Sequence, residues 1–155
     1  MNAILLKKAL INGVKNLVNN QTTINDCNYF PVPDRDTGTN MAITAINAYV
    51  FFNEYNGDDC KVLLELFSKG AFFGARGNSG IILSQIFDGM YQGISENCKQ
   101  ITYKNLTKLL NYAVKTSKKS VIKVAKFSII SVLSSAYKQY KYNISKNVMK
   151  DVKYF

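Results

Sequence analysis

Histidine is missing from this chain of 155 residues. Its absence removes the commonest general base and the commonest metal ligand found in proteins. Any metal ion must therefore be held by oxygen ligands, which suits Mg²⁺ or a similar hard cation. The three cysteines, Cys27, Cys60 and Cys98, are odd in number and lack the spacing of a metal site. We therefore expect free thiols and a cytoplasmic protein.

Proline and long apolar runs are also scarce. The two prolines and nine glycines leave little room for a turn-rich β architecture. No uncharged apolar stretch reaches the ~20 residues needed to span a bilayer, and Lys7 and Lys8 interrupt the apolar run near the start. We expect neither a transmembrane segment nor a signal peptide. The hydrophobic content of 47% is nevertheless that of a globular protein.

Acidic residues are almost absent from the second part of the chain. Residues 97–155 carry thirteen lysines with Asp151 as their only acid, a net charge of +12, whereas residues 1–96 have a net charge of −2. Such asymmetry can mark a surface for nucleic acid, anionic lipid or an acidic protein. The lysines recur at roughly helical intervals, without arginine clusters or a nucleic-acid-binding motif. We interpret them as a solvated helical face and expect no specific nucleic-acid binding.

Helical periodicity, in contrast, runs through most of the sequence. Apolar residues at i, i+3 and i+4 predict six helices, which cover the chain up to Asn19-Asn20, from Thr39 or Asn40 to about Tyr55, and about 59–73, 81–94, 103–121 and 127–142. Thr39 or Asn40 is predicted to cap the second helix. We therefore predict an all-α fold, an antiparallel up-down helical bundle with short loops.

Two polar loops, residues 25–40 and 74–80, each precede a predicted helix. In an up-down bundle their positions along the chain put both loops at the same end. The unpaired N–H groups and the positive dipole end of a helix N-terminus suit phosphate. The end of the bundle that holds both loops is therefore the candidate binding site.

The first loop contains Asp34 and Asp36, which an extended backbone would aim to one side. Two converging carboxylates repel each other unless a cation such as Mg²⁺ lies between them. The residues that follow offer close backbone approach and hydroxyl or amide partners: Thr37, Gly38, Thr39 and Asn40. By spacing alone, a capping loop with solvated aspartates explains the pattern as well.

The second loop reads Gly74-Ala75-Arg76-Gly77-Asn78-Ser79-Gly80. Three glycines in seven residues cost conformational entropy, which favours close backbone approach to a ligand. Arg76 is a natural partner for phosphate or carboxylate. The order of residues is not that of a P-loop, and simple packing or turn geometry remains the alternative.

Together, P-V-P-D-R-D-T-G-T-N-M and G-A-R-G-N-S-G-I-I-L-S-Q-I resemble the L-type nucleotide-binding domain (DhaL) of dihydroxyacetone kinases. They are most similar to the N-terminal domain of bacterial fatty acid kinase, its A subunit. The resemblance runs from about Lys7 to Tyr140 and implies about eight antiparallel helices that bind ATP or ADP with two Mg²⁺ ions. By position it implies metal binding by Asp34 and Asp36. It also implies nucleotide contacts from Thr37, Gly38, Thr39, Asn40, Asn78, Ser79, Gly80 and Ser128, with Asn28 and Arg76 as further candidates.

The resemblance implies a kinase that phosphorylates a fatty acid, giving an acyl phosphate, or dihydroxyacetone. In fatty acid kinase, a separate fatty-acid-binding protein presents the acyl chain. Metal ions and positioned donors carry most of phosphoryl transfer, so no catalytic proton-transfer residue is expected. Dihydroxyacetone kinases attach their substrate to a histidine of another subunit or domain, a step that this chain alone cannot perform.

The sequence departs from the family pattern at several positions. Arg35 stands where the family has glycine, and Tyr29, beside Asn28, stands where dihydroxyacetone kinases have a third aspartate. The family's E-G-T-I-L-T-V-I element corresponds to residues 126–133, with Phe127 in place of glycine.

Length is a further departure. We interpret residues 1–155 as one such domain, shortened at its C-terminal end, with about six of the eight helices. An apolar flank would then need cover, and an active enzyme would need separately encoded domains. The alternative is a non-catalytic, shortened binding or regulatory module.

Overall fold

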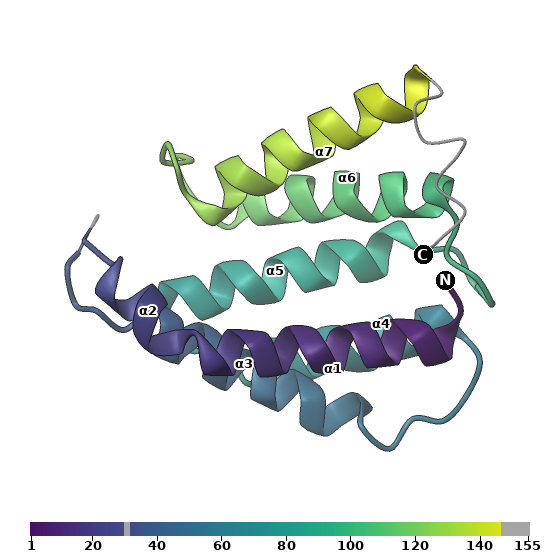
Figure 1. Ribbon diagram of the computed structural model, residues 1–155, viewed down its shortest axis with the longest axis horizontal. Helices are drawn as coiled ribbons and strands as arrows, with labels where there is room; N and C mark the ends of the chain where they lie inside the picture. Colours follow the sequence, from purple (N-terminus) through teal and green to yellow (C-terminus); the bar gives the residue numbers. More distant parts are fainter. Residues whose placement is uncertain (30–31, 147–155) are drawn as a thin grey trace.

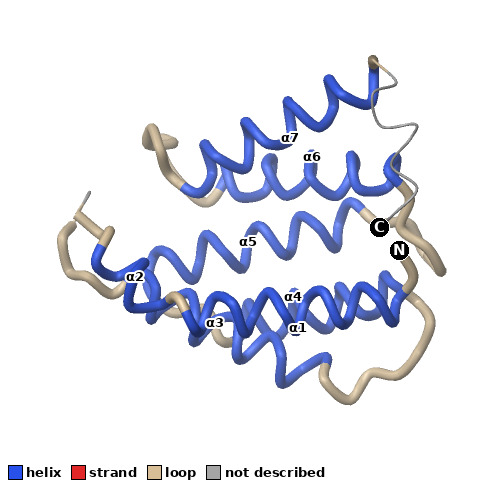
Figure 2. Tube along the Cα trace, in the orientation of Figure 1, coloured by secondary structure: helices blue, strands red, loops and turns tan. Residues whose placement is uncertain are grey.

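The computed structural model describes residues 1–29 and 32–146. In this part of the chain, helices account for all of the regular structure and no strand forms, which confirms the all-α prediction. The helices are α1 (Ala3–Asn19), α2 (Gln21–Asp26), α3 (Thr37–Phe52), α4 (Cys60–Phe73), α5 (Gly77–Gly93), α6 (Tyr103–Lys119) and α7 (Ile129–Ser145). The long helices run up and down, with the connections at the two ends of the bundle (Figure 1, Figure 2).

The helices differ from those predicted mainly in the first half of the chain. The six-residue helix α2 forms where a loop was expected, α3 begins two residues earlier than Thr39, and α5 begins at Gly77 instead of Ile81. A helix as short as α2 carries too few residues to show a hydrophobic period. The early starts of α3 and α5 lie at polar or glycine residues, which periodicity does not detect.

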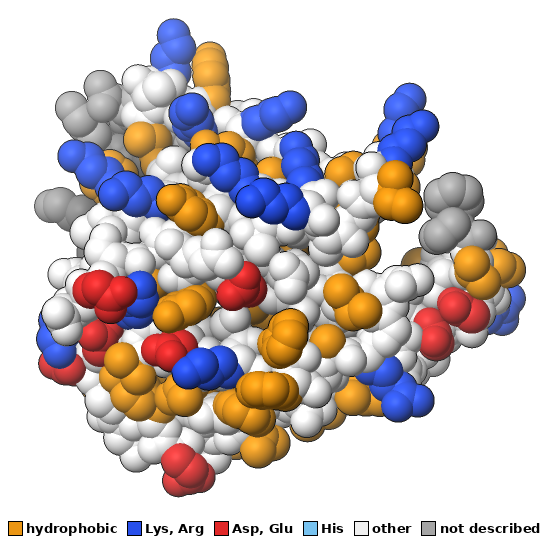
Figure 3. All heavy atoms as spheres, turned by 180° about the vertical axis from the view of Figure 1, so that it is seen from behind, with side chains coloured by type: hydrophobic (Ala, Val, Ile, Leu, Met, Phe, Trp, Pro, Cys, Tyr) orange, Lys and Arg blue, Asp and Glu red, His pale blue; other side chains and the backbone are white. Residues whose placement is uncertain are grey.

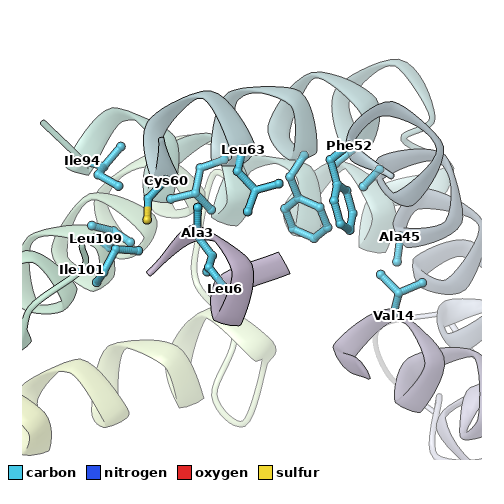
Figure 4. Packing of buried hydrophobic residues seen from close by; sticks show 14 residues of the cluster. Ala3, Leu6, Val14, Ala45, Phe52, Cys60, Leu63, Ile94, Ile101 and Leu109 are labelled. Atoms are coloured by element: carbon cyan, nitrogen blue, oxygen red, sulfur yellow. The ribbon is translucent and has the colours of Figure 1, made fainter. Parts of the chain in front are cut away.

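The core lies between α3 and α4, with α1 on one side and α5 on the other (Figure 4). Phe52 of α3 meets Phe67 of α4 edge to face, with ring centroids 5.3 Å apart. Leu63 and Leu64 are completely buried beside them. Val62, the residue before Leu63, is 37% exposed.

The closest helix pair is α5 with α6, and two glycines of α5 allow it. A Cβ on Gly89 would lie 2.5 Å from the Cα of Ala113, and one on Gly93 would lie 2.9 Å from the Cα of Leu109. The glycines are four residues apart, so they lie on one face of α5. Side chains larger than hydrogen at these positions would push α6 away.

Helix α7 packs against α6 and against no other described helix. Ile130 is its only buried side chain, whereas Ile129, Val132 and Tyr142 remain exposed. Part of the apolar surface of α7 is therefore uncovered by the described residues. No helix in residues 1–29 or 32–146 is both long and apolar enough to cross a bilayer.

Candidate functional site

Two asparagines from outside α3 hold its first turn. The Oδ1 of Asn28 accepts hydrogen bonds from the backbone N–H of Thr37, at 3.2 Å, and from its hydroxyl, at 2.6 Å. The Oδ1 of Asn25 accepts the N–H of Thr39 at 3.1 Å, and its Nδ2 donates to the hydroxyl of Thr39 at 2.9 Å. The prediction that Thr39 or Asn40 caps this helix is therefore wrong.

The N-cap position of α3 belongs to Asp36, but its carboxylate makes no capping hydrogen bond. Asp34 and Asp36 are both exposed. None of the ion pairs between described residues involves either of them. The two acids predicted to bind metal thus lie just before α3, and their carboxylates make no hydrogen bond or ion pair with a described side chain.

Arg35, between these acids, has a φ of 54°, in the left-handed region that glycine adopts most easily. Its guanidinium lies over the ring of Tyr29, 5.8 Å from the centroid. The positive charge of Arg35 thus interacts with the aromatic ring and not with the neighbouring carboxylates. Arg35 therefore does not neutralise the candidate metal ligands by an ion pair.

The second loop leads from α4 into α5, with Arg76 as the N-cap residue. No side chain caps α5, so its first N–H groups are left for solvent or a ligand. Gly77 has a φ of +61°, and Gly77, Asn78 and Arg76 are all exposed. Thr44 of α3 holds the backbone of this loop, because its Oγ1 accepts a hydrogen bond from the N–H of Arg76 at 3.2 Å.

The two loops meet at one end of the bundle, as the order of helices predicted. The hydroxyl of Ser79 lies 3.5 Å from the carbonyl oxygen of Thr37. A Cβ on Gly77 would lie 2.5 Å from Nδ2 of Asn40. The N-termini of α3 and α5 are therefore neighbours, and α7 also begins at this end (Figure 1).

Asn40 is the most enclosed polar residue between the two loops. It is buried, and its side-chain amide makes no hydrogen bond to any described residue. Its carbonyl oxygen, in contrast, accepts the hydroxyl of Thr44 at 2.8 Å. An amide with free donor and acceptor capacity therefore faces the start of α5.

Gly80 and Gly38 serve packing. A Cβ on Gly80 would lie 2.4 Å from Oγ1 of Thr44, and one on Gly38 would lie 2.1 Å from the carbonyl oxygen of Gln21. Both glycines are needed for the helices to approach each other. Gly80 thus packs closely against Thr44, and Gly38 packs against the backbone of Gln21. The nucleotide contacts predicted for both glycines stay predictions.

Ser128 is the N-cap of α7, where its Oγ accepts the N–H of Ser131 at 3.3 Å and donates to the carbonyl oxygen of Ala125 at 2.8 Å. No hydrogen bond between described residues joins Ser128 to the two loops. Its hydroxyl is used locally, and its predicted nucleotide contact stays a prediction.

The charge pattern at this end separates into two sides. In Figure 3 lysines gather over the part of the molecule formed by α6 and α7, whereas acidic side chains lie elsewhere on the same face. No group of three or more acidic or thiol side chains in the described residues is placed to hold a metal ion. A metal held by Asp34 and Asp36 would need further ligands from elsewhere, such as phosphate oxygens.

A shallow hollow of about 360 Å³ lies at the opposite end of the bundle. It is lined by Met1, Asn2, Ile4, Leu5, Lys8 and Gln100. None of the predicted site residues contributes to it.

The sequence did not identify two residues of the site, Asn25 and Thr44. Asn25 is the first residue of the predicted loop and reaches α3 across fourteen positions, so only the folded chain shows its role. Thr44 lies one helical turn after Asn40, and this spacing was the available signal.

Comparison with known proteins agrees with this geometry. The DAK2 domain matches residues 31–153. An uncharacterized protein of Staphylococcus epidermidis (strain ATCC 12228 / FDA PCI 1200) is 37% identical over 138 residues, which cover 89% of this chain and 25% of the relative. An uncharacterized protein of Staphylococcus aureus (strain USA300) is 38% identical over 136 residues, which cover 88% of this chain and 25% of the relative. The chain thus spans a quarter of the length of these relatives. It belongs to the DAK2 domain family, the L-type domain of the dihydroxyacetone kinases.

Proposed function

We propose that this chain is the nucleotide-binding unit of a kinase that phosphorylates a fatty acid or dihydroxyacetone, and that it holds ATP or ADP together with Mg²⁺. The observation that carries the proposal is the pair of unused carboxylates, Asp34 and Asp36, beside the neighbouring N-termini of α3 and α5. Membership of the DAK2 family supports the same reading.

The residues present fit such a ligand. Asp34 and Asp36 supply the two carboxylates that Mg²⁺ accepts in phosphate complexes. The uncapped first turn of α5, at Gly77 and Asn78, supplies N–H donors for phosphate. The free amide of Asn40 lies between the loops. Bound Mg²⁺ would supply charge stabilisation to the transferring phosphoryl group.

The N-termini of α3 and α5 differ in how many of their backbone N–H groups remain free to bind a ligand. The N–H groups of Thr37 and Thr39 are already bonded to asparagine side chains, so α3 offers phosphate fewer donors than α5 does. We therefore assign the main phosphate contacts to the start of α5 and metal binding to the loop before α3. The roles of Ser128 and Arg76 are secondary in this proposal.

Calorimetry with the intact chain tests the proposal. ADP with Mg²⁺ should bind, and Asp34→Asn or Asp36→Asn should weaken binding at least tenfold, because each removes a charged metal ligand without changing side-chain size. Asp26→Asn is the matched control, since Asp26 is an exposed aspartate of α2. Mg²⁺ without nucleotide should bind weakly, because two carboxylates alone make an incomplete site. Absence of nucleotide binding at millimolar ADP and Mg²⁺ would refute the proposal.

A second candidate is a non-catalytic binding or regulatory module, favoured by Arg35 and Phe127, which have positive φ values and stand where the family pattern has glycine. Both candidates bind nucleotide, but they differ in phosphoryl transfer. The distinguishing assay measures acyl phosphate formation from ATP, with a fatty-acid-binding partner and any separately encoded kinase domains added. Transfer that depends on Asp34 and Asp36 supports the kinase. Nucleotide binding without transfer in the complete mixture supports the module.

A further inference from the structure

The connection between α6 and α7, residues 120–128, carries two apolar side chains that contact almost nothing. Ile122 is fully exposed, and Phe127 is 95% exposed. Val132, one turn into α7, is 61% exposed on the same hairpin. Large apolar side chains exposed singly are common in proteins, but these protrude together at one tip.

Four lysines surround this tip. Lys118 and Lys119 end α6, Lys123 and Lys126 lie in the connection, and all four are exposed. No acidic residue lies between Glu96 and Asp151 in the sequence. None of the described ion pairs involves these lysines. Figure 3 shows the blue side chains gathered along this part of the molecule.

Protruding apolar side chains among unpaired lysines match one environment in particular. An anionic lipid surface attracts the lysines, and its soft interior accepts apolar side chains without a preformed pocket. Nucleic acid would satisfy the lysines but leave Ile122 and Val132 in water. We propose that the tip of the α6–α7 connection binds the surface of a membrane that contains anionic phospholipid.

The tip lies at the end of the bundle that also holds the two loops of the candidate site (Figure 1). Docked in this way, the chain presents that end toward the lipid surface. The proposal does not depend on nucleotide binding, and the two can fail separately.

Vesicle co-sedimentation with the full chain tests the proposal. Vesicles of phosphatidylglycerol and phosphatidylcholine should bind the protein at about 0.1 M salt, where surface charges are partly screened, and pure phosphatidylcholine vesicles should bind it at least tenfold more weakly. The double variant Ile122→Ser/Phe127→Ser should lose at least tenfold in affinity. Its control is Ile4→Ser/Val50→Ser, which removes two side chains of 65% and 64% exposure on other helices.

Two variants test the lysines. Each replaces four lysines by Gln, so the two variants have the same net charge. Replacement of the four tip lysines by Gln should abolish vesicle binding. Replacement of Lys8, Lys15, Lys104 and Lys141 by Gln should retain most of it. Lys118 and Lys119 also complement the dipole at the end of α6, so thermal unfolding of each variant is recorded alongside.

Insertion itself can be followed by fluorescence, because the chain contains no tryptophan. Phe127→Trp should shift its emission to the blue when phosphatidylglycerol vesicles are added, whereas Val50→Trp should not. The proposal is overturned if neither lipid mixture binds, if the serine variants of the tip and the control bind equally, or if the tip tryptophan does not respond. Binding to single-stranded RNA without binding to vesicles would also overturn it, in favour of nucleic acid.

Discussion

The backbone N–H of Arg76 donates a hydrogen bond to Oγ1 of Thr44, with 3.2 Å between nitrogen and oxygen. Thr44 is fully buried in α3, and its hydroxyl also donates to the carbonyl oxygen of Asn40 at 2.8 Å. One hydroxyl group therefore ties the start of α5 to the helix that follows the acidic loop.

Thr44→Val should lower the free energy of unfolding by about 2 kcal/mol, because it keeps the shape but leaves the N–H of Arg76 without its acceptor. It should also weaken binding of ADP with Mg²⁺, since the loop before α5 loses its anchor. Urea denaturation and calorimetry measure the two effects. Thr107→Val is the control, because its hydroxyl bonds only within α6, to Tyr103. Equal losses in both variants would contradict the prediction.

Gly89→Ala should destabilise the protein by about 2 kcal/mol, since the new methyl group would meet the backbone of α6 and not a movable side chain. Gly13→Ala is the opposite case, because nothing lies within 4 Å of its added Cβ. That change should raise the free energy of unfolding by about 0.8 kcal/mol through helix propensity. Thermal or urea unfolding compares the two variants. The prediction fails if both changes shift the free energy of unfolding in the same direction.

Arg35 and Phe127 have φ values of 54° and 60°, and both stand where the family pattern has glycine. Left-handed backbone costs a residue with a side chain about 1 kcal/mol. We therefore expect the glycine variant at either position to be more stable than the alanine variant by about 1 kcal/mol. Lys123, which is not among the positive-φ residues, is the control, where alanine should match or exceed glycine. Denaturation midpoints of the six variants decide the matter.

Burial raises the pKa of the Cys60 thiol above its usual value of 9.0, and the nearby Cys98 thiol adds to this. The folded protein therefore keeps this proton to higher pH than the unfolded chain does. The resulting stability is complete below pH 9.0 and is lost as pH rises through the raised pKa.

Cys60→Ala should therefore show a shallower loss of stability than the wild type between about pH 8.5 and 10.5, measured by urea denaturation. Cys27→Ala, which removes an exposed thiol, is the control for the loss of one cysteine. Iodoacetamide should modify Cys27 first and Cys60 last in the native protein. Rapid modification of Cys60 in the native protein would show that its thiol is not buried, which would contradict the prediction.

Periodicity was sufficient to predict the six long helices and their antiparallel order, because burying one face of each helix fixes most of the fold. It missed α2, which is too short to show a period. The order of the helices also predicted that the two polar loops lie at the same end of the bundle. The caps from Asn25 and Asn28 could not be predicted, since they join residues nine and fourteen positions apart through the fold.

Among the described helices, α7 is attached to α6 alone, with Ile130 as its one buried side chain. Its release would break one helix interface and leave the aromatic centre between α3 and α4 intact. The energy needed for this opening is therefore a fraction of that for global unfolding. We therefore expect the backbone amides of α7 to exchange their hydrogens faster than those of α3 and α4.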